Sequence, residues 1–270
     1  MSVLPDHTMP PGRVIVLMYH GLHTARDGPG HFDPRYSVRP EDFHAQLEYL
    51  SESQLVSWLP VAGEPLVAPA RPGERDMVLI TFDDGDISWV ETALPMLQAR
   101  GFGAVFFVTR DYVGRRGMID ACALRQLSSA GMPIGSHGVS HRFLNTLPPA
   151  VLEFELSHSR EFLEQATGRP VCLLSLPGGR GGKRELEAAR QCGYRSVFGS
   201  QPGNNLATRY GDLIQRIAIT RDMTLEGFRQ VLDWRGPAAW RIRARHAALR
   251  WPKRVLGDRG YDWLRNAWVR

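Results

Sequence analysis

The sequence predicts an α/β fold, a distorted seven-stranded β/α barrel with extra helices at the C-terminal end. Seven short apolar runs alternate with helical patterns, which favours a parallel sheet covered by helices. A chain of 270 residues is long enough for one such barrel. The glycine-rich stretch PGGRGG lacks both the dinucleotide-binding pattern and the GK[ST] ending of a P-loop, so a nucleotide-binding fold is disfavoured.

Seven runs are predicted as strands because they are short, apolar and bounded by turn residues. In chain order they are Val14–Tyr19, Met77–Phe82, Ala104–Val108, Pro133–Ser136, Val171–Leu176, Ser196–Phe198 and Leu213–Thr220. In a β/α barrel the carboxyl ends of the strands meet at one face, where active sites lie. Polar residues that follow these runs are therefore expected to converge.

Helices are predicted from apolar residues at helical spacing and from Pro and Gly at the helix ends. One opens at Pro40; the others are Trp89–Arg100, Ala121–Ala130, Pro149–Thr167, Lys183–Cys192 and Thr224–Trp234. A long loop, Gly21–Arg39, follows the first strand, and loops of that length are usually functional or disordered. The Pro-rich stretch Gly63–Asp76 is predicted to be a surface connection.

Two adjacent carboxylates, Asp83 and Asp84, follow the second predicted strand and precede Gly85. Neighbouring side chains on an extended backbone point to opposite sides, so one carboxylate can bind a metal while the other takes a proton. Gly85 allows a sharp turn and a close approach of a ligand. The alternative is a polar turn whose Asp caps the next helix.

Two histidines, His137 and His141, stand four residues apart behind the fourth predicted strand. One helical turn or a tight loop would place both imidazoles on one side, although such a pair is often only a surface feature. Two histidines and one carboxylate form a three-ligand set that leaves room for water and substrate, as catalytic zinc sites do. Together with the paired carboxylates, they predict a metal site.

The stretches TFDDG and SHGVSH resemble the first two motifs of the polysaccharide deacetylases, carbohydrate esterase family 4, and the resemblance extends over residues 14–220. It implies a β/α barrel and hydrolysis of an N-acyl group from an amino sugar. It also implies that Asp83 is the general base and that Asp84, His137 and His141 bind a divalent metal. Zinc is expected from the ligand types, with cobalt and nickel not excluded.

The third family motif, Arg-x-Pro-Tyr/Phe-Gly, is matched only in part by SLPGG at residues 175–179. Pro177 and Gly179 match, whereas the leading Arg and the aromatic residue are missing. The resemblance implies that the backbone N–H of Gly178 stabilises the oxyanion, and a backbone donor survives the loss of a side chain. Pro177, Gly179 and Arg180 are predicted to contact substrate.

In the family the motif-three arginine steadies the catalytic Asp. Arg180 or Arg216 is a candidate substitute here, and a surface or structural role is the alternative for both.

The resemblance also bears on the catalytic acid, a His that the family carries in a Leu-x-His motif near the C-terminus. The last predicted strand has no His. Members that de-N-acetylate poly-N-acetylglucosamine look circularly permuted and take this His from an N-terminal Tyr-His, to which Tyr19–His20 is similar. We therefore predict that His20 protonates the leaving amine; a buried structural His is the alternative.

Three residues of the long loop are further candidates for the pocket. His23 and His31 could line it, although solvated loop histidines are the alternative. Tyr36 is predicted to contact the sugar.

The charge distribution predicts two parts, a catalytic barrel at residues 1–234 and a basic helical tail at residues 235–270. The whole chain has a net charge of +5, but the tail has 10 Lys/Arg and 2 Asp/Glu, which leaves the barrel slightly acidic. Trp240 and Trp251 share an apolar stripe flanked by arginines, as in helices that bind anionic membrane surfaces. The alternative is a pair of helices that pack on the barrel.

Localisation is predicted to be cytoplasmic, with peripheral contact at the inner face of the membrane. The first apolar run, Val14–Tyr19, is too short for a signal peptide or a membrane span. Cys122, Cys172 and Cys192 show no CxxC spacing and are interpreted as reduced packing residues. Nucleic acid is disfavoured as a partner because the barrel is acidic and the sequence shows no known nucleic-acid-binding module.

The predicted function is that of a metal-dependent carbohydrate N-deacetylase in the biosynthesis of a cell-surface polysaccharide or glycolipid. Its partner would be an amino-sugar substrate, either an oligosaccharide or a lipid-linked sugar. Two alternatives stay open: a catalytically silent barrel that binds glycans or serves as a scaffold, and a deacylase or deformylase of another amide. The degraded third motif favours the silent barrel, whereas the intact carboxylates and histidines argue against it.

Overall fold

The computed structural model describes residues 13–25, 33–60, 76–203, 205, 213–234 and 236–244. Contacts between residues divide the chain into two units, Met1–Leu225 and Glu226–Arg270. The first unit carries the sheet and every predicted site residue that is described. The predicted boundary after Trp234 stays a prediction.

The first unit is built on a parallel sheet with the strand order β10-β9-β8-β7-β6-β5-β1-β11. Its strands are β1 (Val14–Tyr19), β5 (Met77–Asp84), β6 (Ala104–Val108), β7 (Ile134–Ser136), β8 (Leu173–Ser175), β9 (Ser196–Phe198), β10 (Leu213–Ile214) and β11 (Ile217–Ala218). A short strand β4 (Val56–Ser57) adds to β5, and β2 (Gly21–Leu22) pairs with β3 (Ser37–Val38) inside the predicted long loop.

The two ends of this strand order meet, so the sheet curls into a distorted barrel as predicted. β10 and β11 stand at opposite ends of the order, yet only Gln215 and Arg216 separate them in the chain. So short a link spans about 10 Å, which brings the two edges together. The prediction of one continuous strand over Leu213–Thr220 is wrong, because the backbone leaves the ladder at Arg216, whose side chain is fully buried.

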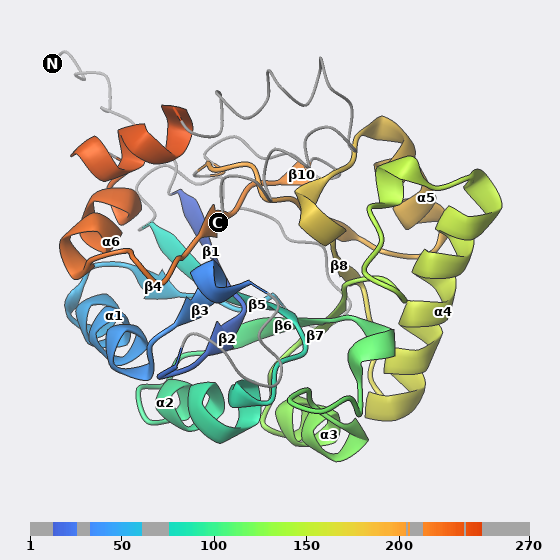
Figure 1. Cartoon of the computed structure of the whole chain (residues 1–270), viewed down its shortest axis with the longest axis horizontal. Coiled ribbons are helices and arrows are strands. Elements are labelled where there is room, and N and C mark those ends of the chain that lie inside the picture. The colour runs from blue at the N-terminus through green and yellow to red at the C-terminus, as the bar shows by residue number, and fades with distance from the viewer. Residues whose placement is uncertain are drawn as a thin grey trace, which may run out of the picture. The chain divides into compact units, whose positions relative to one another are not determined.

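Helices surround the curled sheet (Figure 1). They are α1 (Pro40–Glu52), α2 (Leu94–Gln98), α3 (Ala121–Ser129), α4 (Pro149–Thr167) and α5 (Lys183–Gln191), and a π-helical turn at Trp89–Ala93 leads into α2. Local signals set the ends: the Asp120 side chain accepts from the Ala123 N–H at the start of α3, and Gly168 ends α4 with a φ of 66°. These helices confirm the predicted alternation to within a few residues at each end.

At the junction of the units, α6 (Leu225–Leu232) buries Phe228, Val231 and Leu232, and residues 236–244 are also helical. Trp240 is 66% exposed. The rest of the predicted basic tail, including Trp251, lies outside the described residues. None of the described helices combines the length and the apolar character that a membrane crossing requires.

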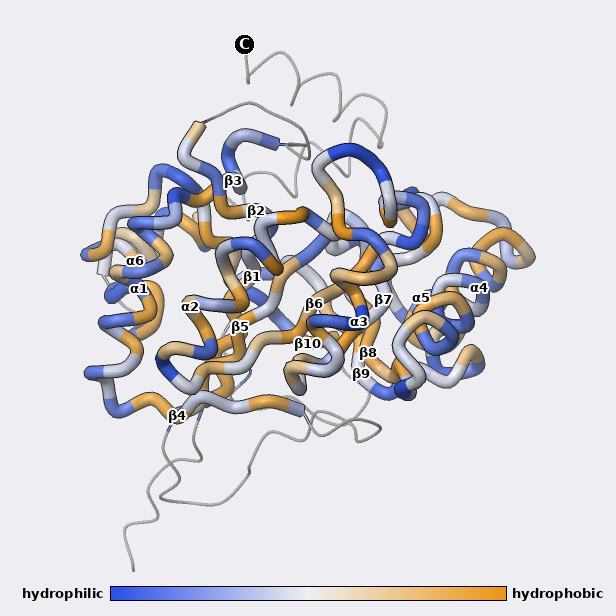
Figure 2. Tube along the Cα trace, turned by 90° about the horizontal axis from the view of Figure 1, so that it is seen from below, coloured by the Kyte–Doolittle hydropathy of each residue, from blue (hydrophilic) through white to orange (hydrophobic). Residues whose placement is uncertain are grey.

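The core has one layer inside the curled sheet and another between the sheet and its helices. Inside, Leu79 on β5 and Phe107 on β6 belong to one buried cluster. Outside, Phe82 of β5 stacks on Phe106 at 5.2 Å and also packs on Phe43 of α1. Strands buried on both faces are continuously apolar rather than alternating, as the tube in Figure 2 shows for β5 and β6.

All three cysteines are unpaired. Cys172 is buried, in agreement with a packing role, but Cys122 is exposed, so that interpretation is wrong for Cys122.

Candidate active site

Asp83 and Asp84 are the last two residues of β5, and both are buried at 2% and 7% exposure. The alternative of a polar turn is therefore wrong for this pair. A regular strand would point the two side chains to opposite faces. Asp84 instead has a φ of 91°, a conformation that re-aims its carboxylate. As a result, His137 Nε2 lies 3.9 Å from Asp83 Oδ2 and 3.6 Å from Asp84 Oδ1.

His137 follows β7, and its ring is fixed by a hydrogen bond to the main chain. Its Nδ1 lies 2.8 Å from the carbonyl oxygen of Ser175 at the end of β8. A carbonyl can only accept, so Nδ1 carries the hydrogen and Nε2 presents a lone pair to the carboxylates. Burial lowers the pKa of His137 to about 4, against an opposing effect of Asp83. The ring is therefore neutral at pH 7, as a metal ligand must be.

His141 closes the loop that begins at His137, and its Nε2 lies 3.2 Å from Asp84 Oδ1. Its side chain is 30% exposed, against 2% for His137, so it forms the solvent side of the cluster. Burial lowers the pKa of His141, but the contact with Asp84 raises it more, and the net direction is upward. Asp84 thus faces two imidazole nitrogens at once.

These three residues fit a divalent metal. Their ligand atoms lie within 4.8 Å of one another. Asp84 Oδ1 is buried and accepts no well-aligned hydrogen bond from the residues that the structure describes. Burial works to raise the pKa of Asp84, but His141 and the other histidine charges bring it well below its usual range, so this oxygen is anionic. A buried anionic oxygen between two imidazole nitrogens is stabilised by a bound cation.

Asp83 is held by an arginine rather than by the histidines. Arg216 donates from both terminal nitrogens, at 2.7 Å to Oδ1 and at 2.6 Å to Oδ2, and its Nε donates to the carbonyl of Gly199. Burial works to raise the pKa of Asp83, but the Arg216 charge leads the effects that lower it, and the net direction is downward. A two-point bond of this kind fixes both the ionisation and the orientation of the carboxylate.

Arg216 thus lies beside Asp83, where the family motif would place an arginine at position 175. Ser175 stands there instead; its hydroxyl donates to Asp83 Oδ2 at 3.1 Å and accepts from Arg216 at 2.7 Å. A small side chain on β8 leaves room for a guanidinium from the link between β10 and β11. Arg216 is 1% exposed, so a surface role is wrong for it. Arg180 lies elsewhere, with its guanidinium carbon 3.9 Å from the centroid of the Phe143 ring.

His20 follows β1 and is half-buried. Its charge lowers the pKa of both Asp83 and Asp84, so it lies within electrostatic reach of the two carboxylates. Its ring stacks on Tyr36 with 4.6 Å between centroids. His20 Nδ1 is buried and has no hydrogen-bond partner among the described residues. Tyr36, predicted to contact the sugar, therefore contacts the predicted acid.

The turn Pro177–Gly179 lies beside the histidine loop. A Cβ placed on Gly138 would stand 3.8 Å from the Pro177 ring. A Cβ on Gly178 would stand 2.6 Å from the ring of Phe143, so that ring takes the space that a side chain at position 178 would need. Pro177 is buried, and Gly178 is exposed with a φ of 61°. The structure thus places Pro177 beside the histidine loop, Gly178 against the Phe143 ring and Gly179 against Ser200.

Other contacts at the cluster were not foreseen. The Tyr112 ring lies 5.9 Å from that of His141, and burial and then Asp84 raise its pKa. Tyr112 follows β6 as His137 follows β7, so the rule that chemistry lies at strand ends could have found it. His23 lies 2.8 Å from Asp86 Oδ2 with a side chain only 15% exposed, so a solvated role is wrong for it. His31 lies outside the described residues.

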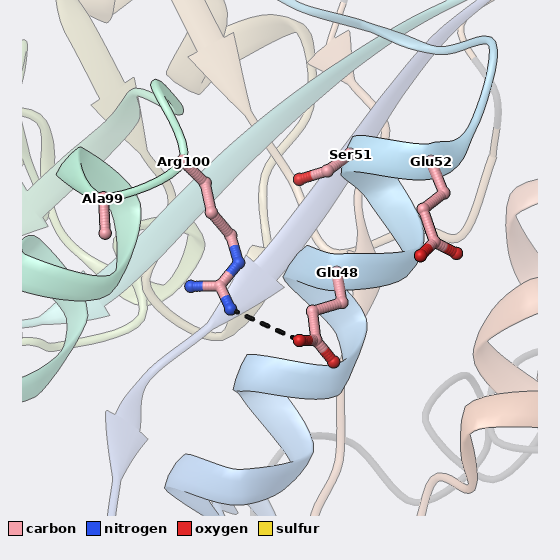
Figure 3. A pocket seen from close by; sticks show the side chains of 5 residues that line it. All are labelled: Glu48, Ser51, Glu52, Ala99 and Arg100. Atoms are coloured by element: carbon pink, nitrogen blue, oxygen red, sulfur yellow. Dashed lines mark ion pairs between the residues drawn. The ribbon is translucent and has the colours of Figure 1, made fainter.

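A separate hollow of about 490 Å³ lies between α1 and the end of α2 (Figure 3). Arg100 points across it to Glu48, with 3.7 Å between the charged atoms. Ser51, Glu52 and Ala99 complete its lining. None of the predicted site residues lines it, and its arginine already pairs with Glu48.

Comparison with known proteins agrees with this geometry. Residues 70–197 match the family model of polysaccharide deacetylases, a range that holds both carboxylates, both histidines and the Pro177–Gly179 turn. The chain carries a polysaccharide deacetylase domain. YxkH of Bacillus subtilis, whose name places it among the polysaccharide deacetylases, is 23% identical over 82% of this chain and 76% of its own.

Two further likenesses extend the comparison. The peptidoglycan-N-acetylglucosamine deacetylase of Bacillus cereus is 27% identical over 48% of this chain and 59% of its own. The structure of the Streptococcus pyogenes deacetylase PplD in complex with acetate superposes with a TM-score of 0.70 at 21% identity, covering 82% of this chain and 99% of that one. The second likeness shows the fold of the deacetylase domain. The family match and the relatives support a hydrolytic deacetylase that acts on polysaccharide.

Proposed function

We propose that the deacetylase domain is a metal-dependent hydrolase that removes an N-acyl group, first of all N-acetyl, from an amino sugar of a cell-surface polysaccharide or glycolipid. One observation carries the proposal: Asp84 Oδ1, which accepts no well-aligned hydrogen bond from the described residues, faces the Nε2 atoms of His137 and His141, and Arg216 pairs with the neighbouring Asp83. The relative named a peptidoglycan-N-acetylglucosamine deacetylase supports an N-acetylated amino sugar as substrate.

Asp84, His137 and His141 would hold the metal, for which zinc is proposed from the ligand types. Such a metal, when bound, polarises the acyl carbonyl and lowers the pKa of water. Asp83 takes a proton from the attacking water, whose oxygen adds to the carbonyl carbon. The Gly178 N–H binds the oxygen on which negative charge develops.

His20 completes the reaction in this proposal. It gives a proton to the nitrogen as the carbon–nitrogen bond breaks, so that the products are acetate and a free amino sugar. Because proton transfer needs a ring within reach of the reacting nitrogen, the electrostatic proximity of His20 to both carboxylates supports this role.

The proposal extends to the place of action. The excess of arginines beyond residue 234 favours a lipid-linked substrate at the cytoplasmic face of a membrane. The test is sedimentation of the whole chain with vesicles of anionic and of neutral lipid. Equal partitioning into both would reject membrane contact and leave the catalytic proposal unchanged.

The test of the chemistry measures acetate and formate released from N-acetylglucosamine oligomers and from lipid-linked N-acylamino sugars. Release by the zinc-loaded protein should stop with a chelator and fall about 10³-fold in Asp83→Asn, because the general base is lost. Asp120→Asn is the matched control, since Asp120 only caps α3. If the protein binds zinc but releases nothing from any substrate, the glycan-binding barrel or a non-sugar amide replaces this proposal.

A further inference from the structure

A carboxylate is buried on α4, away from the predicted ligands. Glu155 is 3% exposed, and a charged group in such a place needs hydrogen-bond partners. Among the described residues, all the hydrogen-bond donors to its carboxyl group belong to one short loop. Its Oε2 accepts from the N–H groups of Val139 at 2.7 Å and Ser140 at 2.9 Å, and its Oε1 accepts from the Ser140 hydroxyl.

That loop joins the two predicted metal ligands. Val139 and Ser140 lie between His137 and His141, so Glu155 binds the backbone that sets the separation of the two imidazoles. Two residues of the loop have left-handed backbone conformations, Gly138 with a φ of 79° and His141 with a φ of 61°. For a residue with a side chain this conformation is unfavourable and persists only where its surroundings hold it.

The fit between Glu155 and the loop is close. A Cβ on Gly138 would stand 3.2 Å from Glu155 Oε2, tighter than an ordinary contact. One turn further along α4, on the same side of the helix, Ser159 Oγ lies 2.7 Å from the hydroxyl of Ser136, which accepts from the Gly138 N–H. The helix thus holds the start of the loop through Ser159 and its end through Glu155.

We propose that Glu155 is a positioning residue of the metal centre. It touches neither metal nor substrate and acts through the loop backbone, which it holds in the conformation that turns His141 toward Asp84. The proposal rests on the proposed function, because it takes the three-residue cluster to be a metal site. Both oxygens of the Glu155 carboxyl group accept hydrogen bonds from the loop, whereas the side chain of a glutamine offers only one accepting oxygen.

The test compares Glu155→Gln with Glu153→Gln, an exposed glutamate on the same helix. In Glu155→Gln the negative charge is lost and one accepting oxygen becomes an NH₂ group, so the bonds to the backbone N–H groups weaken and the Ser140 hydroxyl can no longer donate at that position. Zinc affinity, measured by competition with a chelator, should fall about 10- to 100-fold, as for other groups that orient metal ligands. The visible spectrum of the cobalt-loaded protein should change as well. Glu153→Gln should match the wild type in both measurements.

A second readout needs no metal. Arg142 is exposed and directly follows His141, so trypsin cleavage after Arg142 in the metal-free protein reports how firmly the loop is held. Glu155→Gln should be cut faster than the wild type. If the wild type binds no zinc, the proposed function fails, while faster cleavage still shows that Glu155 holds the loop.

Unchanged zinc affinity and an unchanged cobalt spectrum in folded Glu155→Gln would overturn the positioning role, even if the melting temperature falls. Should that variant not fold, Ser140→Ala removes only the hydroxyl contact. It should weaken zinc binding a few-fold, and no change in that variant would overturn the proposal equally.

Discussion

His137 and His20 each follow a strand of the same sheet, yet the protein holds the two rings by different means. The His137 ring donates to a backbone carbonyl and is almost fully buried. The His20 ring stacks on Tyr36, and its Nδ1 has no hydrogen-bond partner in the described part of the chain. A hydrogen bond to a carbonyl selects one tautomer of the His137 ring, which suits a metal ligand, whereas stacking on Tyr36 fixes the plane of the His20 ring without selecting a tautomer.

The support behind His20 lies one step further away. Arg221 is 5% exposed, and its side chain donates to the backbone carbonyls of His23 and Ser37, among others. Its backbone N–H donates to the carbonyl of Arg35 at 2.7 Å. Tyr36 therefore lies between Arg35 and Ser37, whose backbone carbonyls both accept hydrogen bonds from Arg221. The comparison teaches that the ring of the proposed ligand His137 is fixed by its own hydrogen bond, whereas the ring of the proposed acid His20 is held only through its neighbour Tyr36.

The largest expected effect separates the two histidines by chemistry. His137→Gln should abolish release of acetate from an N-acetylated sugar and also hydrolysis of an activated ester such as 4-nitrophenyl acetate, because a metal ligand serves both. His20→Gln should lower amide hydrolysis about 10²-fold or more yet leave the ester nearly unaffected, because nitrophenolate leaves without a proton. Steady-state rates on the two substrates measure this. Equal losses on both in His20→Gln would remove His20 from the acid role.

A smaller effect tests the arginine that holds Asp83. In Arg216→Met the burial that raises the pKa of Asp83 remains while the leading charge that lowers it is gone, so the pKa of Asp83 rises. A general base works only when deprotonated, so the acidic limb of the kcat/KM profile should move to higher pH. At alkaline pH the rate should still fall about tenfold, from loss of a charged hydrogen bond.

Arg216→Lys is the control for this prediction, since it keeps the charge and loses only the two-point geometry. Its acidic limb should stay lower than that of Arg216→Met. An unshifted limb in Arg216→Met, in protein that circular dichroism shows to be folded, would mean that Asp83 does not set the limb.

The smallest expected effect concerns the stacking partner. Tyr36→Leu should lower kcat for the amide by up to about tenfold, the range of an aromatic pair, while zinc affinity stays unchanged. Tyr36→Phe keeps the ring and should keep the rate. If Tyr36→Phe loses as much as Tyr36→Leu, the hydroxyl rather than the stacking matters, as a direct contact with the sugar predicts.

Local patterns were enough to predict most of the strands, most helix ends and the convergence of the paired carboxylates with His137 and His141, whereas the family resemblance implied that Asp84 rather than Asp83 is the ligand. Buried parallel strands are continuously apolar and easily found, and residues at their carboxyl ends must converge. The left-handed φ of Asp84 was not predictable, because it depends on what surrounds the end of β5.

The roles of Glu155 and Arg216 depend on contacts between segments that are distant in the sequence. Glu155 sits in a helix with many charges, and nothing local distinguishes it from the exposed Glu153. Arg216 did leave a signal, a charge inside an otherwise apolar run, which marks a break in the strand rather than a surface position. Arg216 takes the place of an arginine at position 175, and this could be predicted only with knowledge of the strand order, because β8 and the β10–β11 link are far apart in sequence.

The link that closes the barrel also has a consequence for biosynthesis. Arg216 stands 133 residues after Asp83, on the segment that joins the two edges of the sheet. While the ribosome is still making that segment, Asp83 is a carboxylate without its counter-charge and the sheet is open. Closure of the sheet and pairing of Asp83 with Arg216 therefore depend on the same segment, and a nascent chain that ends before this segment has neither.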